Sequence, residues 1–127
     1  MKTMTREHEV DYVFAEPSGI VVPFELRNTI ASAGRDARVK AGSVVMLLNA
    51  ADPALPFNDY VAHVTRQQVA QADIIAVTKQ DDASEGGVEV LEQAARGLAP
   101  DTPLFVVSTK SLAGLAELVD AVLGPAA

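Results

Sequence analysis

Short runs of apolar residues alternate along the chain with segments whose apolar residues recur at helical spacing. Four of the runs are continuous rather than alternating, and they occupy residues 11–16, 43–50, 72–79 and 102–110 (DYVFAE, SVVMLLNA, ADIIAVTK and TPLFVVSTK). Continuous runs rich in Val, Ile and Leu are typical of strands that are buried on both faces of a parallel sheet. We therefore predict strands near residues 12–16, 43–49, 73–78 and 103–108.

Helical patterns lie between and after these runs. Apolar residues form one stripe in residues 88–98 and another in 111–123, with further helical patterns in 57–72 and in 23–33, where Pro23 suits a first turn. Strand and helix alternate throughout, which predicts an α/β fold with a parallel sheet of about four strands, right-handed crossovers and helices on both faces. The 127 residues suit one domain, and the Gly- and Pro-containing linkers are short enough to be turns.

Composition and charge narrow the classes of partner. Hydrophobic residues make up 49% and charged residues 21%, as in ordinary globular domains. The net charge of -7 argues against nucleic acid or an anionic membrane as the main partner. The chain has no Cys, which excludes disulfides, thiolate zinc sites and cysteine nucleophiles. It also has neither a signal-peptide pattern nor an apolar run of about 18 residues, so we expect a cytoplasmic protein.

Polar residues follow each apolar run. They are Glu16–Gly19, Asn49–Asp52, Thr78–Asp81 and Ser108–Lys110. Because the carboxyl ends of parallel strands open onto the same edge of a sheet, these four tips are expected on one rim, where α/β proteins bind ligands. The alternative is that each strand simply ends in polar residues.

Residues 78–81 (TKQD) and 108–110 (STK) fit recognition of a guanine base. The Asp81 carboxylate can accept hydrogen bonds from the guanine N1–H and exocyclic amine, a donor pair that adenine lacks. Lys79 can lay its aliphatic stem along the base while its ammonium stays in solvent. Backbone N–H groups of residues 108–110 can bind the guanine O6. The alternative for this loop is that Ser108 or Ser111 caps the next helix.

Glu16 and Gly19 fit the phosphate end of a nucleotide. An acid at the end of a buried strand can hold hydrated Mg²⁺ or orient water near a γ-phosphate. Gly19 would let the backbone approach a phosphate closely. The alternative is a strand-end carboxylate followed by a turn.

Four segments together resemble the CobW-like family of P-loop GTPases, whose relatives include accessory GTPases of urease and hydrogenase maturation. The segments read DYVFAEPSGIVVP, VVMLLNAAD, QVAQADIIAVTKQD and LFVVSTKSLAGLAELVDAV, and the resemblance runs from about Asp11 to Leu123. It implies GTP and Mg²⁺ as cofactors, and a set of site residues. The implied residues are Glu16 as the catalytic acid near Mg²⁺, Gly19 after the γ-phosphate-sensing position, Thr78, Lys79 and Asp81 as the guanine-specificity motif, and Ser108, Thr109 and Lys110 as the second base-binding loop.

The chain also departs from the family pattern. It lacks the phosphate loop Gly-x-x-x-x-Gly-Lys-[Ser/Thr] and the family's Cys-containing metal motif, and Thr78 stands where the base motif usually has Asn. We therefore expect residues 1–127 to form one partial GTPase-like domain, the second half of such a domain, with little hydrolysis by this chain alone. Either residues 12–16 pair directly with residues 43–49, or a companion chain supplies the missing strand and phosphate loop.

These observations lead to three functional hypotheses. The first is a guanine-nucleotide-binding half-domain of a CobW-like metallochaperone that delivers a metal or metallocofactor to a metalloenzyme client. The second is a non-catalytic α/β protein-interaction module that has lost nucleotide turnover. The third is a flavodoxin- or receiver-like domain, which would need an acidic pair after the first strand and an Asp after the third, an order this chain does not match.

Overall fold

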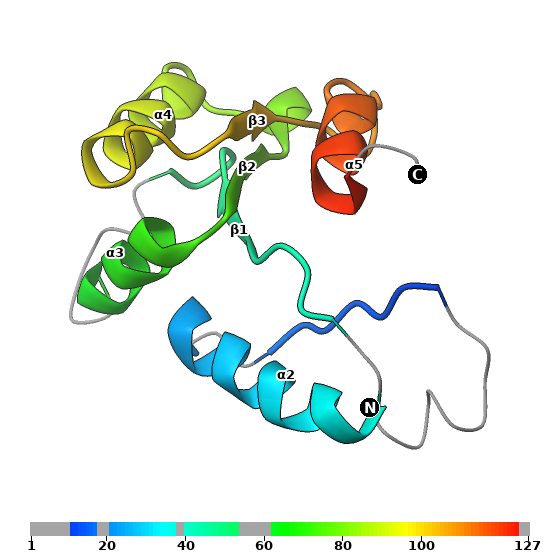
Figure 1. The fold of residues 1–127 in the computed structure, drawn as a ribbon. Helices are drawn as coiled ribbons and strands as arrows, with labels where there is room; N and C mark the ends of the chain where they lie inside the picture. The colour runs from blue at the N-terminus through cyan, green and yellow to red at the C-terminus, as the bar shows by residue number, and fades with distance from the viewer. Residues whose placement is uncertain (1–10, 18–20, 38–39, 54–61, 125–127) are drawn as a thin grey trace. The chain divides into compact units, whose positions relative to one another are not determined.

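The computed structural model describes residues 11–17, 21–37, 40–53 and 62–124 (Figure 1). The chain divides into two compact units, Met1–Gly42 and Ser43–Ala127.

The described residues of the first unit include helix α2 and an irregular segment. Helix α2 spans Pro23–Ala37 and confirms the helix predicted over 23–33. Its first residue is Pro23. Proline suits this position because the N–H that it lacks would have no hydrogen-bond partner within the helix. The Leu26 N–H donates to the Val22 carbonyl at 3.2 Å, which begins the helical hydrogen bonding.

The strand predicted at residues 12–16 is absent. Residues 12–17 are described and belong to neither a helix nor a strand, and Tyr12 and Phe14 are 58% and 77% exposed. An extended segment becomes a strand only when a neighbouring strand takes up its backbone N–H and C=O groups. The described residues provide no such ladder here, so an apolar run by itself was not sufficient to form a strand.

The second unit is built on a three-stranded parallel sheet in the order β1-β2-β3. The strands are β1 Val45–Asn49, β2 Ile74–Thr78 and β3 Leu104–Val106. Leu47 lies opposite Ala76 in the first pair, and Val77 lies opposite Val106 in the second. The predicted α/β fold with a parallel sheet is confirmed, with three strands in place of about four. Within the described ranges β1 has β2 as its one strand neighbour, and the direct pairing of residues 12–16 with residues 43–49 stays a prediction.

Among the residues that the structure describes, this unit also has three helices and one short turn: α3 Ala62–Gln71, η2 Gln80–Asp82, α4 Gly87–Leu98 and α5 Leu115–Leu123. The helix predicted over 88–98 is confirmed within one residue. Figure 1 shows α3 and α4 on one side of the strands and α5 on the other. Helices on both faces are what buried parallel strands require.

The hydrophobic core lies between the sheet and the α3–α4 layer. Leu48, Ile75 and Val77 project from β1 and β2 into a cluster with Val69 of α3 and Leu91 of α4, and all five side chains are buried. Burial of each of these side chains contributes about 1.5–3 kcal/mol relative to exposure. This layer therefore accounts for most of the packing that holds the sheet.

Asp73 fastens the start of the sheet. Its carboxylate accepts the Val44 N–H at 2.8 Å, and the Val44 carbonyl accepts the N–H groups of Asp73 and Ile74 at 2.9 and 3.2 Å. These bonds align β1 with β2 before the first residue pair of the ladder.

A membrane-spanning helix needs length and apolar character together, and none of the helices in the described part of the chain has both.

Candidate functional site

The loop that follows β2 turns sharply at Lys79. Thr78 ends the strand, Lys79 adopts left-handed backbone angles (φ 58°, ψ 40°), and Gln80–Asp82 form a single 3-10 turn. The Gln80 N–H donates to the Val107 carbonyl at 3.1 Å, which fastens the loop to the end of β3. The left-handed residue costs about 1–2 kcal/mol, and the bond to β3 helps to hold it.

A hydrogen bond joins the two loops that the sequence singled out. The Ser108 hydroxyl donates to Asp81 Oδ1 at 2.6 Å, although the two residues are 27 positions apart. The Ser108 hydroxyl also accepts the Ser111 N–H at 3.1 Å, and the Ser108 N–H donates to the Ala113 carbonyl at 3.0 Å. Ser108 is fully buried while Asp81 is exposed. A buried, fully bonded hydroxyl therefore fixes one oxygen of an accessible carboxylate.

Electrostatics keep that carboxylate ionised. The Ser108 hydrogen bond is the main cause that lowers the pKa of Asp81 below its ordinary value of 3.8. Desolvation opposes it, and a backbone hydrogen bond and the charges of Lys110 and Lys79 lower the pKa further. An ionised carboxylate is an acceptor with two oxygens and about four lone-pair sites. Since Ser108 occupies one site on Oδ1 and the residue is exposed, Asp81 retains acceptor capacity for a ligand with paired N–H donors.

Residues 108–114 form a loop and not the start of a helix. Leu112 and Gly114 both have positive φ, 67° and 72°, and α5 begins at Leu115 with Gly114 as its N-cap. The predicted helix start at 111 and the predicted capping by Ser108 or Ser111 are therefore wrong. The reason is that Ser108 is engaged with Asp81, while positive φ excludes Leu112 from a right-handed helix.

Gly114 was missed by sequence reasoning. A Cβ on this residue would collide with the carbonyl oxygen of Val106, so the loop can fold back onto β3 only with glycine. The signal in the sequence was a glycine that interrupts the apolar stripe of SLAGLAEL. The same close approach carries Ser108 and Ser111 to the end of the sheet beside Asp81.

Thr78 has a structural hydrogen bond. Its hydroxyl donates to the Leu48 carbonyl at 3.3 Å, and its own carbonyl accepts the Ala50 N–H at 2.9 Å. Its register partner Asn49 accepts the Ala51 N–H at 2.9 Å through Oδ1. The two residues thus hold the ends of β1 and β2 together behind the loop that carries Asp81.

The other residues of the two loops are accessible. Lys79, Thr109 and Lys110 are all exposed. The charges of Lys79 and Lys110 both lower the pKa of Asp81. The structure thus brings together the predicted base-side residues from β2 and β3.

Glu16 and Gly19 are the residues predicted for the phosphate end of the nucleotide. Glu16 is exposed and follows the irregular segment in the first unit, so its predicted setting at the end of a strand is wrong. Gly19 lies outside the described residues. The described residues include no group of three or more His, Asp or Glu side chains that could hold a metal ion.

The fold agrees with a comparison of protein families. A family model described as CobW/HypB/UreG, nucleotide-binding domain, matches residues 1–106. The chain belongs to this family. The CobW/HypB/UreG match includes all three strands and the loop with Asp81, and it confirms the resemblance seen in the sequence. Ser108 and α5 lie beyond the matched residues. No curated protein matches the chain.

Proposed function

We propose that the 78–81 and 108–110 loops bind the base of a guanine nucleotide, as part of a GTP-binding metallochaperone of the CobW/HypB/UreG family. The observation that supports this most directly is the 2.6 Å hydrogen bond from Ser108 to Asp81. It holds an ionised, exposed carboxylate at the carboxyl end of a parallel sheet, which is where α/β folds bind their ligands.

Guanine is the base whose chemistry matches this carboxylate. Its N1–H and exocyclic amine are adjacent donors, and Asp81 would accept both. Adenine presents an acceptor at N1, so its approach would place two acceptors against one another. Charge-assisted hydrogen bonds contribute about 1.5–3 kcal/mol each, and about 1.4 kcal/mol corresponds to tenfold in affinity. We expect a preference for guanine over adenine of at least about tenfold.

The neighbouring residues would complete the base site. Lys79 would cover one face of the base with its aliphatic stem, and its ammonium would stay in water. Backbone N–H groups of Thr109 and Lys110 would donate to the guanine O6. Thr78 would act indirectly, by holding the strand end through its bond to Leu48.

The phosphate end needs groups that the described residues do not supply. A phosphate loop contributes backbone N–H donors and a Lys, and most catalysis of phosphoryl transfer comes from such positioning. We propose that a companion chain provides this half, that Glu16 serves as the acid near Mg²⁺ with Gly19 near the γ-phosphate, and that the complete assembly delivers a metal or metallocofactor to a metalloenzyme client. This chain alone should bind guanine nucleotides in the millimolar range, about -4 kcal/mol, with negligible hydrolysis.

Titration of the isotope-labelled chain with GMP and AMP tests the base site separately from the phosphates. GMP should shift the backbone resonances of Lys79–Asp82 and Ser108–Ser111, and AMP should bind at least tenfold more weakly. Asp81→Ala should remove the preference. Asp81→Asn should transfer it to XMP, because an amide donates to the xanthine carbonyl that replaces the guanine amine. The matched control Asp82→Asn, on the same turn, should leave the preference for GMP unchanged.

Two outcomes would argue against a guanine site. One is equal binding of GMP and AMP by the unaltered chain, and the other is a GMP preference that survives Asp81→Ala. In either case the non-catalytic interaction module becomes the better hypothesis for this chain.

A further inference from the structure

The loop that carries Asp81 begins and ends beside Ala50, the first residue after β1. The loop starts after Thr78, the last residue of β2, and ends at Gly87, the first residue of α4. The Ala50 N–H donates to the Thr78 carbonyl at 2.9 Å. The Ala50 carbonyl oxygen lies against Gly87, where an added Cβ would be 2.8 Å away from it. Ala50 therefore meets both ends of the loop through its two backbone groups.

Space, and not backbone conformation, requires a glycine at position 87. Gly87 does not have a positive φ, unlike its neighbour Gly86, so an alanine would adopt the same angles without strain. An added Cβ would also lie 2.9 Å from the Ser84 hydroxyl oxygen and 3.4 Å from Cγ of Pro53. The hydroxyl can rotate away, whereas the Ala50 carbonyl belongs to backbone that is bonded to β2. The contact between Gly87 and Ala50 is therefore the one that yields only if the backbone moves.

Both residues of this contact are buried. Ala50 is 0% exposed, and Gly87 is buried at the start of α4. Ala50 also belongs to the hydrophobic core that contains Leu48 and Leu91. Close-packed interiors have few voids that could absorb a displacement, so they transmit it. A wider separation of Ala50 and Gly87 would therefore shift the end of the loop and the short turn that holds Asp81.

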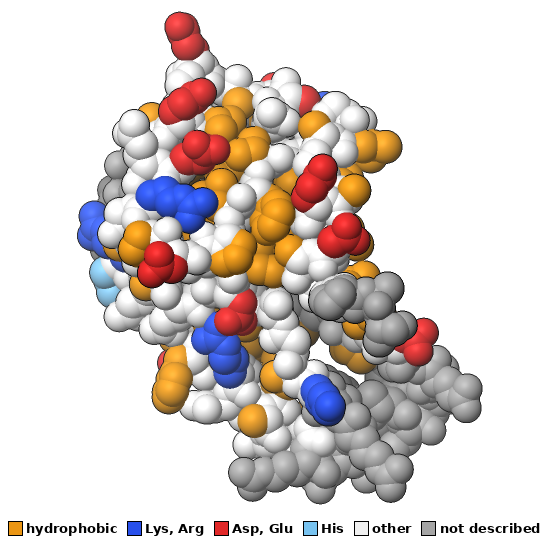
Figure 2. All heavy atoms as spheres, turned by 45° about the horizontal axis from the view of Figure 1, so that its top comes forward, with side chains coloured by type: hydrophobic (Ala, Val, Ile, Leu, Met, Phe, Trp, Pro, Cys, Tyr) orange, Lys and Arg blue, Asp and Glu red, His pale blue; other side chains and the backbone are white. Residues whose placement is uncertain are grey.

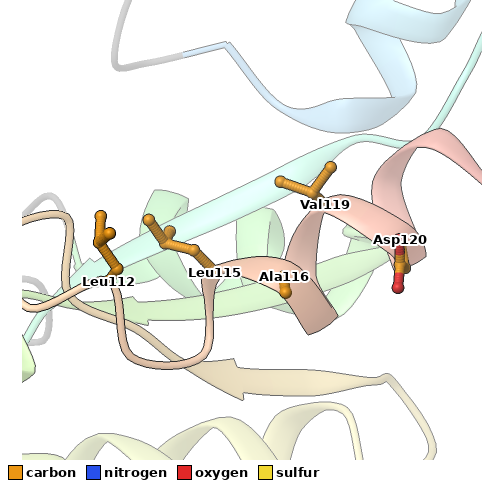
Figure 3. Close-up of a pocket in the computed structure, with 5 residues that line it drawn as sticks. All are labelled: Leu112, Leu115, Ala116, Val119 and Asp120. Atoms are coloured by element: carbon orange, nitrogen blue, oxygen red, sulfur yellow. The ribbon is translucent and has the colours of Figure 1, made fainter.

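The other support of this loop, on the β3 side, is packed less tightly within the second unit. Leu112 belongs to the loop that carries Ser108 and is exposed, and none of the residues of α5 is fully buried. The side chains of Leu112, Leu115 and Val119 point to one side and line a hollow (Figure 3). Figure 2 shows hydrophobic side chains among acidic ones on the face that it draws. The Ser108 hydroxyl orients the carboxylate, while the tightly packed reference for the loop is Ala50.

We infer that Gly87 and Ala50 are positioning residues of the base site, and that their contact fixes where Asp81 stands relative to a bound base. This rests on the proposed function, because the base is the guanine proposed there. The two residues act through the loop between them and do not touch the base. Two adjacent N–H donors need both carboxylate oxygens in one orientation, since hydrogen bonds weaken steeply as their angle closes. A displaced loop would therefore lose the preference for guanine while the fold persists.

Gly87→Ala in the full chain tests the contact. GMP and AMP are titrated into the isotope-labelled protein, and the pKa of the Asp81 carboxyl is measured by carbon NMR without nucleotide. The variant should lower the preference for GMP over AMP at least about threefold, or about 0.7 kcal/mol. The pKa of Asp81 should rise toward its ordinary value of 3.8, because the displaced carboxylate loses part of the Ser108 hydrogen bond.

Two control variants separate positioning from a loss of stability. Gly86→Asn changes the adjacent glycine, where an added Cβ meets nothing within 4 Å and Asn tolerates the positive φ of 74°. Leu91→Ala leaves a cavity in the core on the same helix and should destabilise the fold. Both should leave the GMP preference and the pKa of Asp81 unchanged while the chain is folded. A merely structural role for Gly87 predicts that Gly87→Ala behaves like Leu91→Ala.

The Ser84 hydroxyl allows the obstacle itself to be identified. Because the Ala50 carbonyl is the contact that cannot rotate away, adding Ser84→Ala to Gly87→Ala should not restore the GMP preference. Restoration would overturn the role of Ala50. A measurement on the unaltered chain needs no variant to fold: saturation with GMP should shift the Ala50 amide resonance together with that of Asp81. An Ala50 resonance that stays fixed while the Asp81 resonance shifts would overturn the coupling.

The positioning role and the base site can fail separately. A folded Gly87→Ala variant that keeps both the GMP preference and the pKa of Asp81 would refute the positioning role alone. Equal binding of GMP and AMP by the unaltered chain would refute the base site. If Gly87→Ala still raises the pKa of Asp81 in that case, the contact positions the carboxylate for a ligand other than guanine.

Discussion

Two segments of this chain have nearly the same sequence pattern and opposite structures. DYVFAE, residues 11–16, and ADIIAVT, residues 72–78, are both continuous apolar runs that end in polar residues. The second contains β2, whose Ile75 and Val77 are fully buried between two strands. The first is irregular and leaves Phe14 77% exposed.

The difference extends to the polar residues at each tip. Asp81, after β2, is held by the buried hydroxyl of Ser108 from the neighbouring loop. Glu16, after the first run, is exposed on irregular backbone. A strand with neighbours on both sides therefore positions the side chains that follow it, and an apolar run without a described neighbour does not. Substitutions can test this difference between the two segments.

The largest effect should come from truncating one side chain in each segment. Ile75→Ala should lower the free energy of unfolding by about 2–5 kcal/mol, because it removes buried atoms and leaves a cavity. Phe14→Ala removes a larger side chain but should cost less than about 0.5 kcal/mol, as is usual for exposed sites. Urea unfolding followed by circular dichroism measures both. A similar cost for the two variants would contradict the comparison.

The next effect should come from the loop that carries Ser108 to Asp81. Gly114→Ala should destabilise the fold by about 2–3 kcal/mol, because Ala resists positive φ and its Cβ meets the Val106 carbonyl oxygen. Gly97→Ala is the matched control. Gly97 lies within α4 with nothing within 4 Å of an added Cβ, so this change should stabilise the fold by about 0.5–1 kcal/mol. Thermal unfolding of both variants should give shifts of opposite sign.

A smaller effect should come from the Ser108–Asp81 bond itself. Ser108→Ala should cost about 1–2 kcal/mol at pH 7, because it removes the hydroxyl that pairs with Asp81 and with the Ser111 N–H. Part of that cost should disappear when Asp81 is already Ala. A double-mutant cycle measures this coupling, and strictly additive effects would show that the hydroxyl does not act through the carboxylate.

The same pair should give a pH dependence whose sign follows from the pKa of Asp81. That pKa is lowered in the folded chain chiefly by the Ser108 hydrogen bond, so the unfolded chain binds the proton more readily. The stabilisation is then complete above the ordinary carboxyl pKa and is lost as pH falls below 3.8 through the lowered folded value. The difference in unfolding free energy between the unaltered chain and Ser108→Ala should therefore shrink between pH 5 and pH 2. A difference that stays constant over this range would contradict the assignment.

Local patterns were sufficient for much of this molecule. Apolar periodicity identified α4 within one residue, and continuous apolar runs located β1, β2 and β3. The tetrad at 78–81 also singled out Asp81, whose role in base recognition stays a prediction. These features depend on side chains a few positions apart, which pack or turn in the same way wherever such a stretch is buried.

What the sequence determined by itself is the α/β class, the parallel sheet and the family of this chain. The tertiary structure alone decided three further points: that residues 12–16 are not a strand, that Ser108 binds Asp81 across 27 positions, and that Gly114 returns the loop onto β3. Each depends on a partner that is distant in sequence. The backbone that lies beside a segment determines whether the segment forms a strand, which acceptor a buried hydroxyl bonds and how much space surrounds a glycine. No local sequence pattern encodes that neighbour.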